Sequence, residues 1–384
     1  MKNKRVVILY RYIPEYRLAV YERLYELCRV NSIDLDIIYG DPSKSDRLKN
    51  DSVDFEFGIF KRNQFWSFGK IELVWQPVLA QIRQADLVIV EQANKLVINY
   101  LLIARQILGR QRFAFWGHGR NFQATQFHSL SERMKRLMIC RAHWWFAYTP
   151  SVARLVEAQG FPRERITTLY NAIDTSALLE FQRNISFAEL DDVRNTTEVH
   201  TENICIYVGG MYSEKRISFL LEACIRVRRQ IPDFQMIFIG SGTDAHLVKD
   251  FCQTHRWAIY LGSAFGRDKV KYFMLSKLLL MPGLVGLAVL DAFTLKVPIV
   301  TTNVDFHSPE FEYIENERNG IIVDPADDVD LYATTVVDLL TDTSRRAALV
   351  DGCRLAASKY TVENMVSHFF EGIARALAFP QSPI

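Results

Sequence analysis

Two glycine-rich segments in the second half of the chain have the composition of a phosphate-binding site. In the first, Gly209-Gly210 ends a β-branched run, and Lys215 and Arg216 follow just before a helix-like segment. Glycine lets a ligand approach the backbone closely, and the free amides of a helix N-terminus together with a Lys bind phosphate. The segment is neither a Walker loop nor the dinucleotide pattern G-x-G-x-x-G, and a purely structural turn explains it equally well.

The second segment, residues 282–291, repeats this arrangement. A strand-like run enters a loop containing Gly283, and Gly286 and Leu287 open a helix that carries Asp291 in its first turn. We expect the amides of Gly286 and Leu287 to bind phosphate and the Asp291 carboxylate to accept hydrogen bonds from ribose hydroxyls. An acid in the first helical turn also interacts favourably with the helix dipole, so a structural role for Asp291 stays open.

Candidates in the first half of the chain also follow strand-like runs. His118 lies between two glycines after residues 112–116, where it can hydrogen-bond a sugar hydroxyl or stabilise developing charge. A surface loop that uses its glycines for turn geometry is the structural alternative. Four further polar residues are assigned to an acceptor side, although plain loop chemistry explains them as well: Arg11, Tyr12, Arg17 and Asn94.

The elements that must position these residues alternate between β-branched runs and helix-like segments in both halves, which predicts parallel sheets. We therefore predict the class α/β, with two doubly wound Rossmann-like domains facing a central cleft and ligands at the carboxyl ends of strands. The expected divisions are an N-terminal domain over 1–180, a polar linker over 181–203, a C-terminal domain over 204–365, and a C-terminal helix and tail over 366–384 that could return to the first domain.

Taken together, the two glycine-rich segments resemble the donor site of the retaining GT-B glycosyltransferases of family 4. Lys215 corresponds to the family's phosphate-binding Lys, and Asp291 to the second of its two acids, which holds the ribose. The other matching segments are residues 166–174, Pro298–Val300, Pro309-Glu310 and Asn319-Gly320. The resemblance spans residues 140–340 and is specific as a set.

The sequence departs from the family at two positions. Gly210 stands where the family has a phosphate-binding Arg, for which Arg216 is a candidate substitute. Gly283 stands where the family has its first acid, which contacts the transferred sugar. This glycine is compatible with an unusual donor sugar, with a donor held by backbone groups, or with no catalysis.

The resemblance implies a hexosyltransferase that moves a sugar from a UDP or GDP sugar to a hydroxyl of a lipid-linked or oligosaccharide acceptor in surface polysaccharide synthesis, with retention. It implies that the domain over 1–180 is acceptor-binding and that the domain over 204–365 is nucleotide-sugar-binding. It also implies catalytic roles for His118, Lys215 and Asp291. The implied donor contacts are Gly209, Gly210, Lys215, Arg216, Gly283, Gly286, Leu287, Asp291 and Glu310. No carboxylate cluster in the sequence suits a divalent ion, so we expect neither a metal nor another cofactor. The alternatives are a non-catalytic nucleotide-sugar or glycan-binding GT-B subunit and a GT-B sugar-nucleotide epimerase.

The charge distribution indicates an anionic partner for the first half. Residues 1–180 hold 26 Lys or Arg against 18 Asp or Glu, with the excess concentrated between Arg105 and Arg141. With the tryptophans that follow, the region 105–145 suits an anionic membrane surface, and a half-buried helix with a solvated basic face is the alternative. No nucleic-acid-binding motif accompanies the basic residues. Without an apolar run of 18 residues or a signal-peptide pattern, we expect a cytoplasmic protein, peripheral at the inner membrane face if this region binds lipid.

Overall fold

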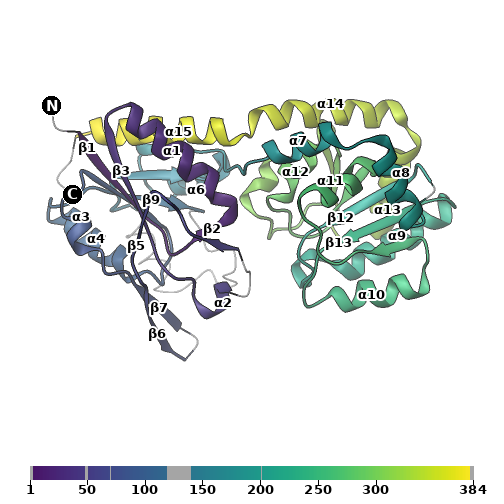
Figure 1. The fold of residues 1–384 in the computed structure, drawn as a ribbon, viewed down its shortest axis with the longest axis horizontal. Coiled ribbons are helices and arrows are strands. Elements are labelled where there is room, and N and C mark those ends of the chain that lie inside the picture. Colours follow the sequence, from purple (N-terminus) through teal and green to yellow (C-terminus); the bar gives the residue numbers. More distant parts are fainter. Residues whose placement is uncertain (1–2, 48–50, 70, 119–139, 200, 381–384) are drawn as a thin grey trace. The chain divides into compact units, whose positions relative to one another are not determined.

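The computed structural model describes residues 3–47, 51–69, 71–118, 140–199 and 201–380 (Figure 1). The chain divides into two compact units. Unit 1 comprises Met1–Asp174 and Val362–Ile384, and unit 2 comprises Thr175–Thr361.

Unit 1 is built on a seven-stranded parallel sheet in the order β11-β10-β9-β8-β1-β3-β5. Its central strands are continuous apolar runs because helices cover both faces of such a sheet. The strands are β1 (Lys4–Leu9), β3 (Ile33–Tyr39), β5 (Gly58–Phe60), β8 (Leu87–Glu91), β9 (Phe113–Gly117), β10 (Trp144–Ala147) and β11 (Ile166–Thr168). The helices are α1 (Leu18–Val30), α2 (Lys44–Arg47), α3 (Leu79–Ile82), α4 (Val97–Ile107), α6 (Pro150–Ala158) and α15 (Val362–Ala378). The strand order reverses between β1 and β8, which makes that position the switch point of the sheet.

Two short antiparallel pairs complete unit 1. They are β2 (Ile13–Pro14) with β4 (Ser52–Val53), and β6 (Gln64–Phe68) with β7 (Ile71–Trp75). Two 3-10 helices, η1 (Glu15–Arg17) and η2 (Arg163–Arg165), precede α1 and β11.

Unit 2 contains a six-stranded parallel sheet in the order β14-β13-β12-β15-β16-β17. The strands are β12 (Ile204–Val208), β13 (Gln235–Ile239), β14 (Ala258–Tyr260), β15 (Leu278–Leu280), β16 (Ile299–Thr302) and β17 (Gly320–Val323). The helices are α7 (Ser176–Asn184), α8 (Phe187–Thr196), α9 (Ile217–Gln230), α10 (Ala245–Thr254), α11 (Gly266–Leu275), α12 (Ala288–Thr294), α13 (Val329–Thr341) and α14 (Thr343–Lys359), with 3-10 helices η3 (Ser213–Lys215) and η4 (Pro309–Tyr313). Here the switch point lies between β12 and β15, which precede the two glycine-rich segments.

The boundaries of the two units differ from the domain boundaries expected from the sequence. Residues 181–203, expected as a linker, contain the end of α7 and all of α8, and they belong to unit 2. Ser186 caps α8 through a capping box with Glu189, and Glu189 in turn binds Arg267 of α11 at 2.9 Å. The segment looked like a linker because both helices are short and mostly exposed, which gives them a polar composition. The C-terminal helix α15 is grouped with unit 1 and packs against α1, and it begins at Val362 rather than 366.

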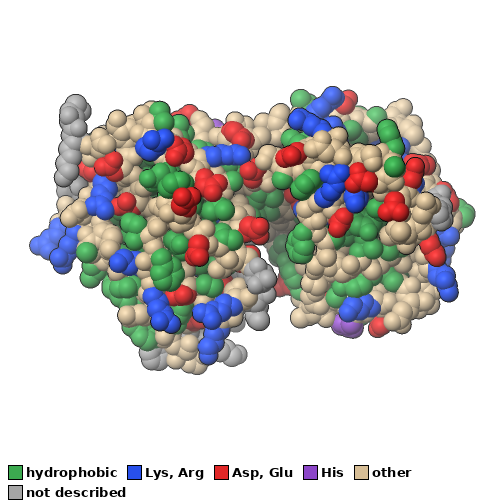
Figure 2. All heavy atoms as spheres, in the orientation of Figure 1, with side chains coloured by type: hydrophobic (Ala, Val, Ile, Leu, Met, Phe, Trp, Pro, Cys, Tyr) green, Lys and Arg blue, Asp and Glu red, His purple; other side chains and the backbone are tan. Residues whose placement is uncertain are grey.

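The face of the molecule drawn in Figure 2 carries charges of both signs. Figure 2 shows Lys and Arg side chains interspersed with Asp and Glu over the visible side of both units. Residues 119–139, which carry Arg120, Arg133, Lys135 and Arg136 of the region 105–145, lie outside the described residues. Among the helices that the structure does describe, none combines the length and apolar character needed to cross a membrane.

Candidate donor-binding site

A pocket of about 270 Å³ opens at the carboxyl ends of β12, β13 and β14 in unit 2. Its lining is mostly backbone and small side chains: Val208, Gly209, Gly210, Ile239, Gly240, Ser241, Ser263, Ala264, Phe265 and Lys269. Gly209 and Gly210, expected at a donor site from the sequence, are therefore among the lining residues. This is the position at which doubly wound sheets bind ligands.

The loop after β13 requires glycine where it packs against the loop after β12. Gly240 has φ +137°, and a Cβ there would lie 1.8 Å from the Gly209 carbonyl oxygen. Gly242 has φ +150°, and its Cβ would lie 2.2 Å from the Met211 oxygen. The two loops are joined by the Met211 amide, which donates to the Ser241 carbonyl at 2.8 Å. The absence of side chains thus lets two loops pack together and present their backbone to a ligand.

Lys215 is a buried cation at the switch point of this sheet. Lys215 is the last residue of η3 and is only 5% exposed. Its Nζ donates to the Leu284 carbonyl at 2.5 Å. Burial lowers the pKa of Lys215 to about 8, against a smaller opposing effect of Glu214. Among the described residues, no carboxylate forms an ion pair with Nζ. A phosphate would supply the missing negative charge.

Gly283 joins the two glycine-rich segments. Leu284 donates its amide to the Glu214 carbonyl at 2.8 Å, and a Cβ on Gly283 would lie 2.3 Å from that oxygen. It would also lie 2.4 Å from the Lys215 carbonyl carbon. The position of the family's first acid is therefore too close to a neighbouring backbone to carry any side chain. The glycine holds the loop of β15 against η3 and fixes the carbonyl to which Lys215 donates.

Gly210 is also restricted, but by a side chain. A Cβ there would lie 2.6 Å from Cε1 of Tyr212, whose ring lies 5.6 Å from Lys215 Nζ. The Tyr212 ring thus occupies the space that an Arg at 210 would need.

Substitution of Gly283 tests this packing. We expect Gly283→Ala to destabilise the protein by about 2 kcal/mol, since overpacking against fixed backbone forces a loop shift, and to weaken nucleotide binding through the displaced Leu284 carbonyl. Gly286→Ala is the matched control, because a Cβ there meets only Ser308 Oγ at 3.7 Å. Chemical denaturation of both variants measures the difference, and equal stability would contradict the close approach.

Asp291 is paired in a way that the sequence did not indicate. It lies in α12, is 8% exposed, and accepts from Lys269 Nζ at 2.7 Å. Lys269 projects from α11 and lines the pocket, so it connects the acid to the cavity. No sequence signal marks Lys269, because it stands 22 positions before Asp291 on a different helix.

His307 supports the second loop. Val285 donates its amide to His307 Nδ1 at 3.0 Å, which leaves the ring proton on Nε2, and Nε2 donates to the Thr302 carbonyl at 2.7 Å. Burial, and secondarily the charge of Lys215, lower the pKa of His307 to about 4, against the hydrogen bond to Thr302. A neutral ring therefore holds the loop that contains Gly286 and Leu287. Glu310 follows in η4, 3% exposed and outside the pocket lining.

Arg216 does not extend the phosphate site. Its backbone is left-handed, with φ +55°, which turns the side chain toward the loop after β17. There the guanidinium donates to the Ala326 carbonyl at 2.8 Å, to Thr302 Oγ1 at 3.1 Å and to Asp327 at 2.6 Å. With these partners, Arg216 is a structural residue of this edge and not the substitute for the missing Arg at 210. Among the described residues that line the pocket, the cation is Lys269, and Lys215 lies outside this lining.

His118 follows β9 in unit 1 and is exposed. Its ring meets the Tyr148 ring edge-on at a centroid distance of 4.3 Å. The dense packing around the ring and the nearby charge of Arg17 lower its pKa to about 4, although part of the residue reaches solvent. His118 is therefore a neutral imidazole at physiological pH, able to donate or accept one hydrogen bond but not to act as a cation.

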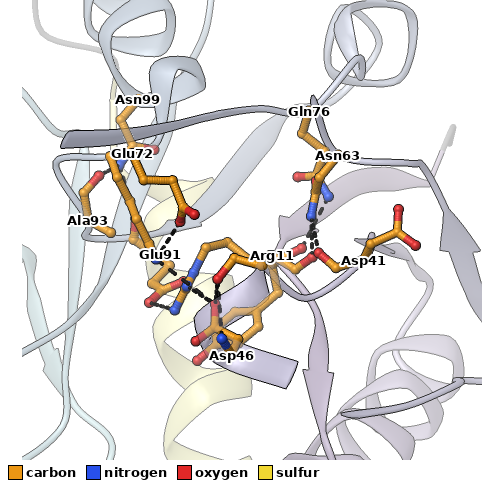
Figure 3. A network of polar contacts seen from close by, with 12 residues as sticks. Arg11, Asp41, Asp46, Asn63, Glu72, Gln76, Glu91, Ala93 and Asn99 are labelled. Carbon is orange, nitrogen blue, oxygen red and sulfur yellow. Dashed lines mark hydrogen bonds and ion pairs between the residues drawn. The ribbon is translucent and has the colours of Figure 1, made fainter. Parts of the chain in front are cut away.

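Arg11 belongs to a network of ion pairs that fixes the switch point of unit 1 (Figure 3). Its guanidinium binds Glu91 at 2.9 Å and Asp46 at 2.9 Å, and Lys95 lies 3.5 Å from Glu72 in the same network. Because carboxylates accept from Nε, Nη1 and Nη2, Arg11 connects the ends of β1, β8 and α2 and is not placed to bind an acceptor.

The remaining acceptor-side candidates have different surroundings. The Arg11 guanidinium lies 5.9 Å from the ring centroid of Tyr12, which is buried. Asn94 is exposed in the turn after β8, where its carbonyl accepts from Tyr100 at 3.0 Å. Arg17 and His118 both contact the ring of Tyr148, whereas Asn94 lies in a turn on the surface. Among the described residues, no group of three or more His, Cys, Asp or Glu could hold a metal ion.

Comparison with known proteins agrees with this architecture. Residues 202–342 match the family model described as glycosyl transferases group 1. Spore coat protein SA of Bacillus subtilis (strain 168) is 23% identical over 203 residues, which cover 49% of this chain and 52% of the relative. The alignment thus spans about half the length of this curated relative.

Solved structures match over nearly the full length. HepE of Anabaena, crystallised in complex with UDP, superposes with a TM-score of 0.69 at 14% identity, covering 97% of this chain and 99% of HepE. A glycosyltransferase from Rickettsia africae superposes with a TM-score of 0.71 at 13% identity, covering 98% of this chain and 99% of its own. At these identities the likeness establishes the fold. The chain has the GT-B fold, and its residues 202–342 are similar to the glycosyl transferases group 1 family.

Proposed function

We propose that this protein is a retaining, metal-independent glycosyltransferase that moves a hexose from a nucleoside diphosphate sugar to a hydroxyl of a lipid-linked or oligosaccharide acceptor. The observation that carries the proposal is the buried Lys215, which has no described carboxylate partner and lies at the switch point of a sheet whose carboxyl edge holds a glycine-lined pocket. HepE, which shares the fold, has been crystallised with UDP-glucose, which favours a uridine donor.

In this proposal the chain's own groups stabilise the leaving diphosphate. Lys215 and the amides of Gly286 and Leu287 supply positive charge and donors where negative charge develops as the glycosidic bond breaks. Asp291, held by Lys269, accepts from the ribose, and the neutral His118 hydrogen-bonds the transferred sugar. The departing phosphate takes the acceptor proton on the same face, so no protein nucleophile is needed.

The position of Gly283 bears on the donor sugar. With no side chain possible at 283, the sugar hydroxyls that the family's first acid would contact are held by backbone groups of the loop 283–287. This favours a donor held by the backbone over a site that has lost its function, because Gly283 is required by the local packing.

The first experiment is a thermal-shift panel with UDP, GDP, ADP, CMP and dTDP and their sugars, with and without EDTA. We expect one nucleoside diphosphate to raise the unfolding midpoint, by the equivalent of about 2.7 kcal/mol at a concentration 100 times its Kd, unaffected by EDTA. Lys215→Met and Asp291→Asn should abolish the shift, and Lys4→Met, at an exposed ion pair in unit 1, should retain it.

The outcomes discriminate between functions. Nucleotide binding followed by sugar transfer to lipid-linked or oligosaccharide acceptors supports the proposal. Nucleotide binding without transfer or nucleotide release would favour the non-catalytic binding subunit. No response to any nucleotide would contradict both.

The charge distribution of the first half bears on where the acceptor is bound. The basic excess of the region 105–145 is the reason for placing the protein at an anionic membrane surface, as in the assembly of surface polysaccharides such as lipopolysaccharide. Co-sedimentation with vesicles containing phosphatidylglycerol, compared with a variant in which Lys135, Arg136 and Arg141 are all changed to Glu, tests this. Unchanged binding of that variant would argue against a membrane partner.

A further inference from the structure

Arg17 of unit 1 is a buried cation that lacks a counter-charge. It is only 2% exposed, and it forms no ion pair with any residue that the structure describes. Among the residues with described positions, Nε has no hydrogen-bond partner, and Nη1 reaches only the sulfur of Met365 at 3.8 Å. Arg11, by contrast, is neutralised by two carboxylates.

Aromatic rings surround the guanidinium. Its central carbon lies 5.1 Å from the ring centroid of Tyr16 and 5.2 Å from those of Trp116 and Tyr148. Cation–π contacts offset part of the cost of burying a charge, but they supply no hydrogen-bond acceptor for a guanidinium that carries five N–H donors. Burial of an uncompensated cation stays unfavourable.

Two further buried donors beside Arg17 have no hydrogen-bond partner within the described part of the chain. They are the indole Nε1 of Trp116, which is 1% exposed, and the hydroxyl of Tyr21, which is fully buried. Their rings meet edge-on at a centroid distance of 6.0 Å. Unsatisfied buried polar groups are rare in native proteins and point to an absent water or ion. A water can satisfy the indole and the hydroxyl but leaves the charge of Arg17 unbalanced, whereas an anion also supplies the missing negative charge.

The cluster lies at the edge of the sheet where ligands bind. Trp116 is near the carboxyl end of β9, and Tyr148 follows the carboxyl end of β10. Tyr148 also contacts His118, which is exposed and whose pKa is lowered in part by the charge of Arg17. Through Tyr148 the cluster is therefore next to an exposed residue, His118.

We infer that Arg17, with Trp116 and Tyr21, forms a subsite for an oxyanion, a phosphate or carboxylate group carried by the acceptor, next to His118. This assignment rests on the proposed function, to which it adds the chemical class of the acceptor: a molecule with a negatively charged group near its reacting hydroxyl. It also gives Arg17 a role different from that of Arg11.

Inorganic phosphate is the probe for this subsite, applied to the full-length protein saturated with its nucleoside diphosphate so that the donor site is filled. Chloride at equal ionic strength is the control. We expect phosphate to raise the unfolding midpoint and to shift one ¹⁹F resonance of the 5-fluorotryptophan-labelled protein, assigned to Trp116 by its loss in Trp116→Phe. Arg17→Met should weaken the phosphate response at least about tenfold, since hydrogen bonds to a charged group are lost. Arg23→Met, which breaks an exposed ion pair on α1, should leave it unchanged.

The test separates this inference from the proposed function. Wild-type protein that binds a nucleotide but shows no phosphate response, or the same response in Arg17→Met, would overturn the anion subsite and leave the donor site intact. Absence of nucleotide binding would overturn the proposed function instead. If Arg17→Met does not fold, Arg17→Lys serves, because it keeps the charge but loses the fork of donors, and its phosphate response should be several-fold weaker. An acceptor screen then distinguishes free phosphate from a group on the acceptor: uncharged acceptors should show a higher KM than phosphorylated ones in the wild type and no difference in the Arg17 variant.

Discussion

Lys215→Met is expected to lower kcat/KM for the nucleotide sugar by at least about 100-fold, because Lys215 is the buried cation placed at the leaving diphosphate. The same variant should be more stable than the wild type at neutral pH. Burial disfavours the ammonium, so the unfolded chain binds protons more readily than the folded one between pH 8 and the ordinary Lys pKa. The destabilising effect of Lys215 is therefore complete below pH 8 and declines as the pH rises above it. A gain in stability with a loss of activity distinguishes a ligand-binding cation from a structural one.

The pH dependence of donor binding follows from the same shift. In the unliganded protein the pKa of Lys215 is about 8, and a bound diphosphate raises it by favouring the charged form. Above pH 8 binding must take up a proton, so affinity should be constant at lower pH and fall by up to about tenfold per pH unit above 8. Calorimetric titration of the nucleotide sugar, whose diphosphate does not titrate in this range, measures it.

Two variants serve as controls for this pH profile. Lys215→Arg should bind with an affinity that is flat over the same range, because a guanidinium stays charged. Lys215→Met should bind weakly at every pH. A wild-type affinity that does not change as the pH rises past 8 would contradict the assignment of Lys215 to the diphosphate.

The sequence predicted the fold well because both sheets are parallel. Strands buried on both faces are continuous apolar runs, such as residues 204–208 and 235–239, and such runs stand out against the amphipathic helices between them. The loops that follow them were also recognisable, since Gly209, Lys215 and Gly286 keep the family's order. The boundary between the units was not predicted, because α7 and α8 are exposed helices whose composition resembles a linker.

The sequence indicated the site's loops but not the partners of its side chains. The pairing of Asp291 with Lys269 depends on how α11 packs beside α12, and the direction of Arg216 depends on one left-handed backbone angle. Neither is encoded in local spacing. The structure also gives a different explanation for Gly283. In the sequence it stands where the family has an acid, and in the folded chain it lets the loop after β15 pack against the backbone of η3. Close approaches of this kind involve residues about 70 positions apart, as for Lys215 and Leu284, and can be seen only in the folded chain.

His118→Ala is expected to lower kcat by about 100- to 1,000-fold while donor affinity stays within about twofold of wild type. We expect kcat to fall without a change in donor affinity because His118 lies in unit 1, whereas the glycine-lined pocket, Lys215 and Asp291 lie in unit 2. With a pKa of about 4, the imidazole is neutral throughout the physiological range, so it contributes as a hydrogen-bonding group and not as an acid. Activity should therefore show no titration of this residue near neutral pH and should decline only as the pH falls toward 4.

The matched control is His246→Ala, an exposed histidine of α10 whose Nδ1 lies 2.8 Å from the carbonyl of Thr243 in its own turn, and this variant should be fully active. His118→Asn keeps one donor and one acceptor and should recover part of the lost rate, because an amide can replace a neutral imidazole in a hydrogen bond but cannot replace a proton-transfer group. If the activity of His118→Ala stays within threefold of wild type, His118 has only a structural role in its loop and no role in catalysis. A parallel loss of donor affinity would instead mean that the substitution disturbs more than unit 1. If His118→Ala loses activity and His118→Asn regains part of it, the role of His118 is to hold a sugar hydroxyl in place with a neutral ring.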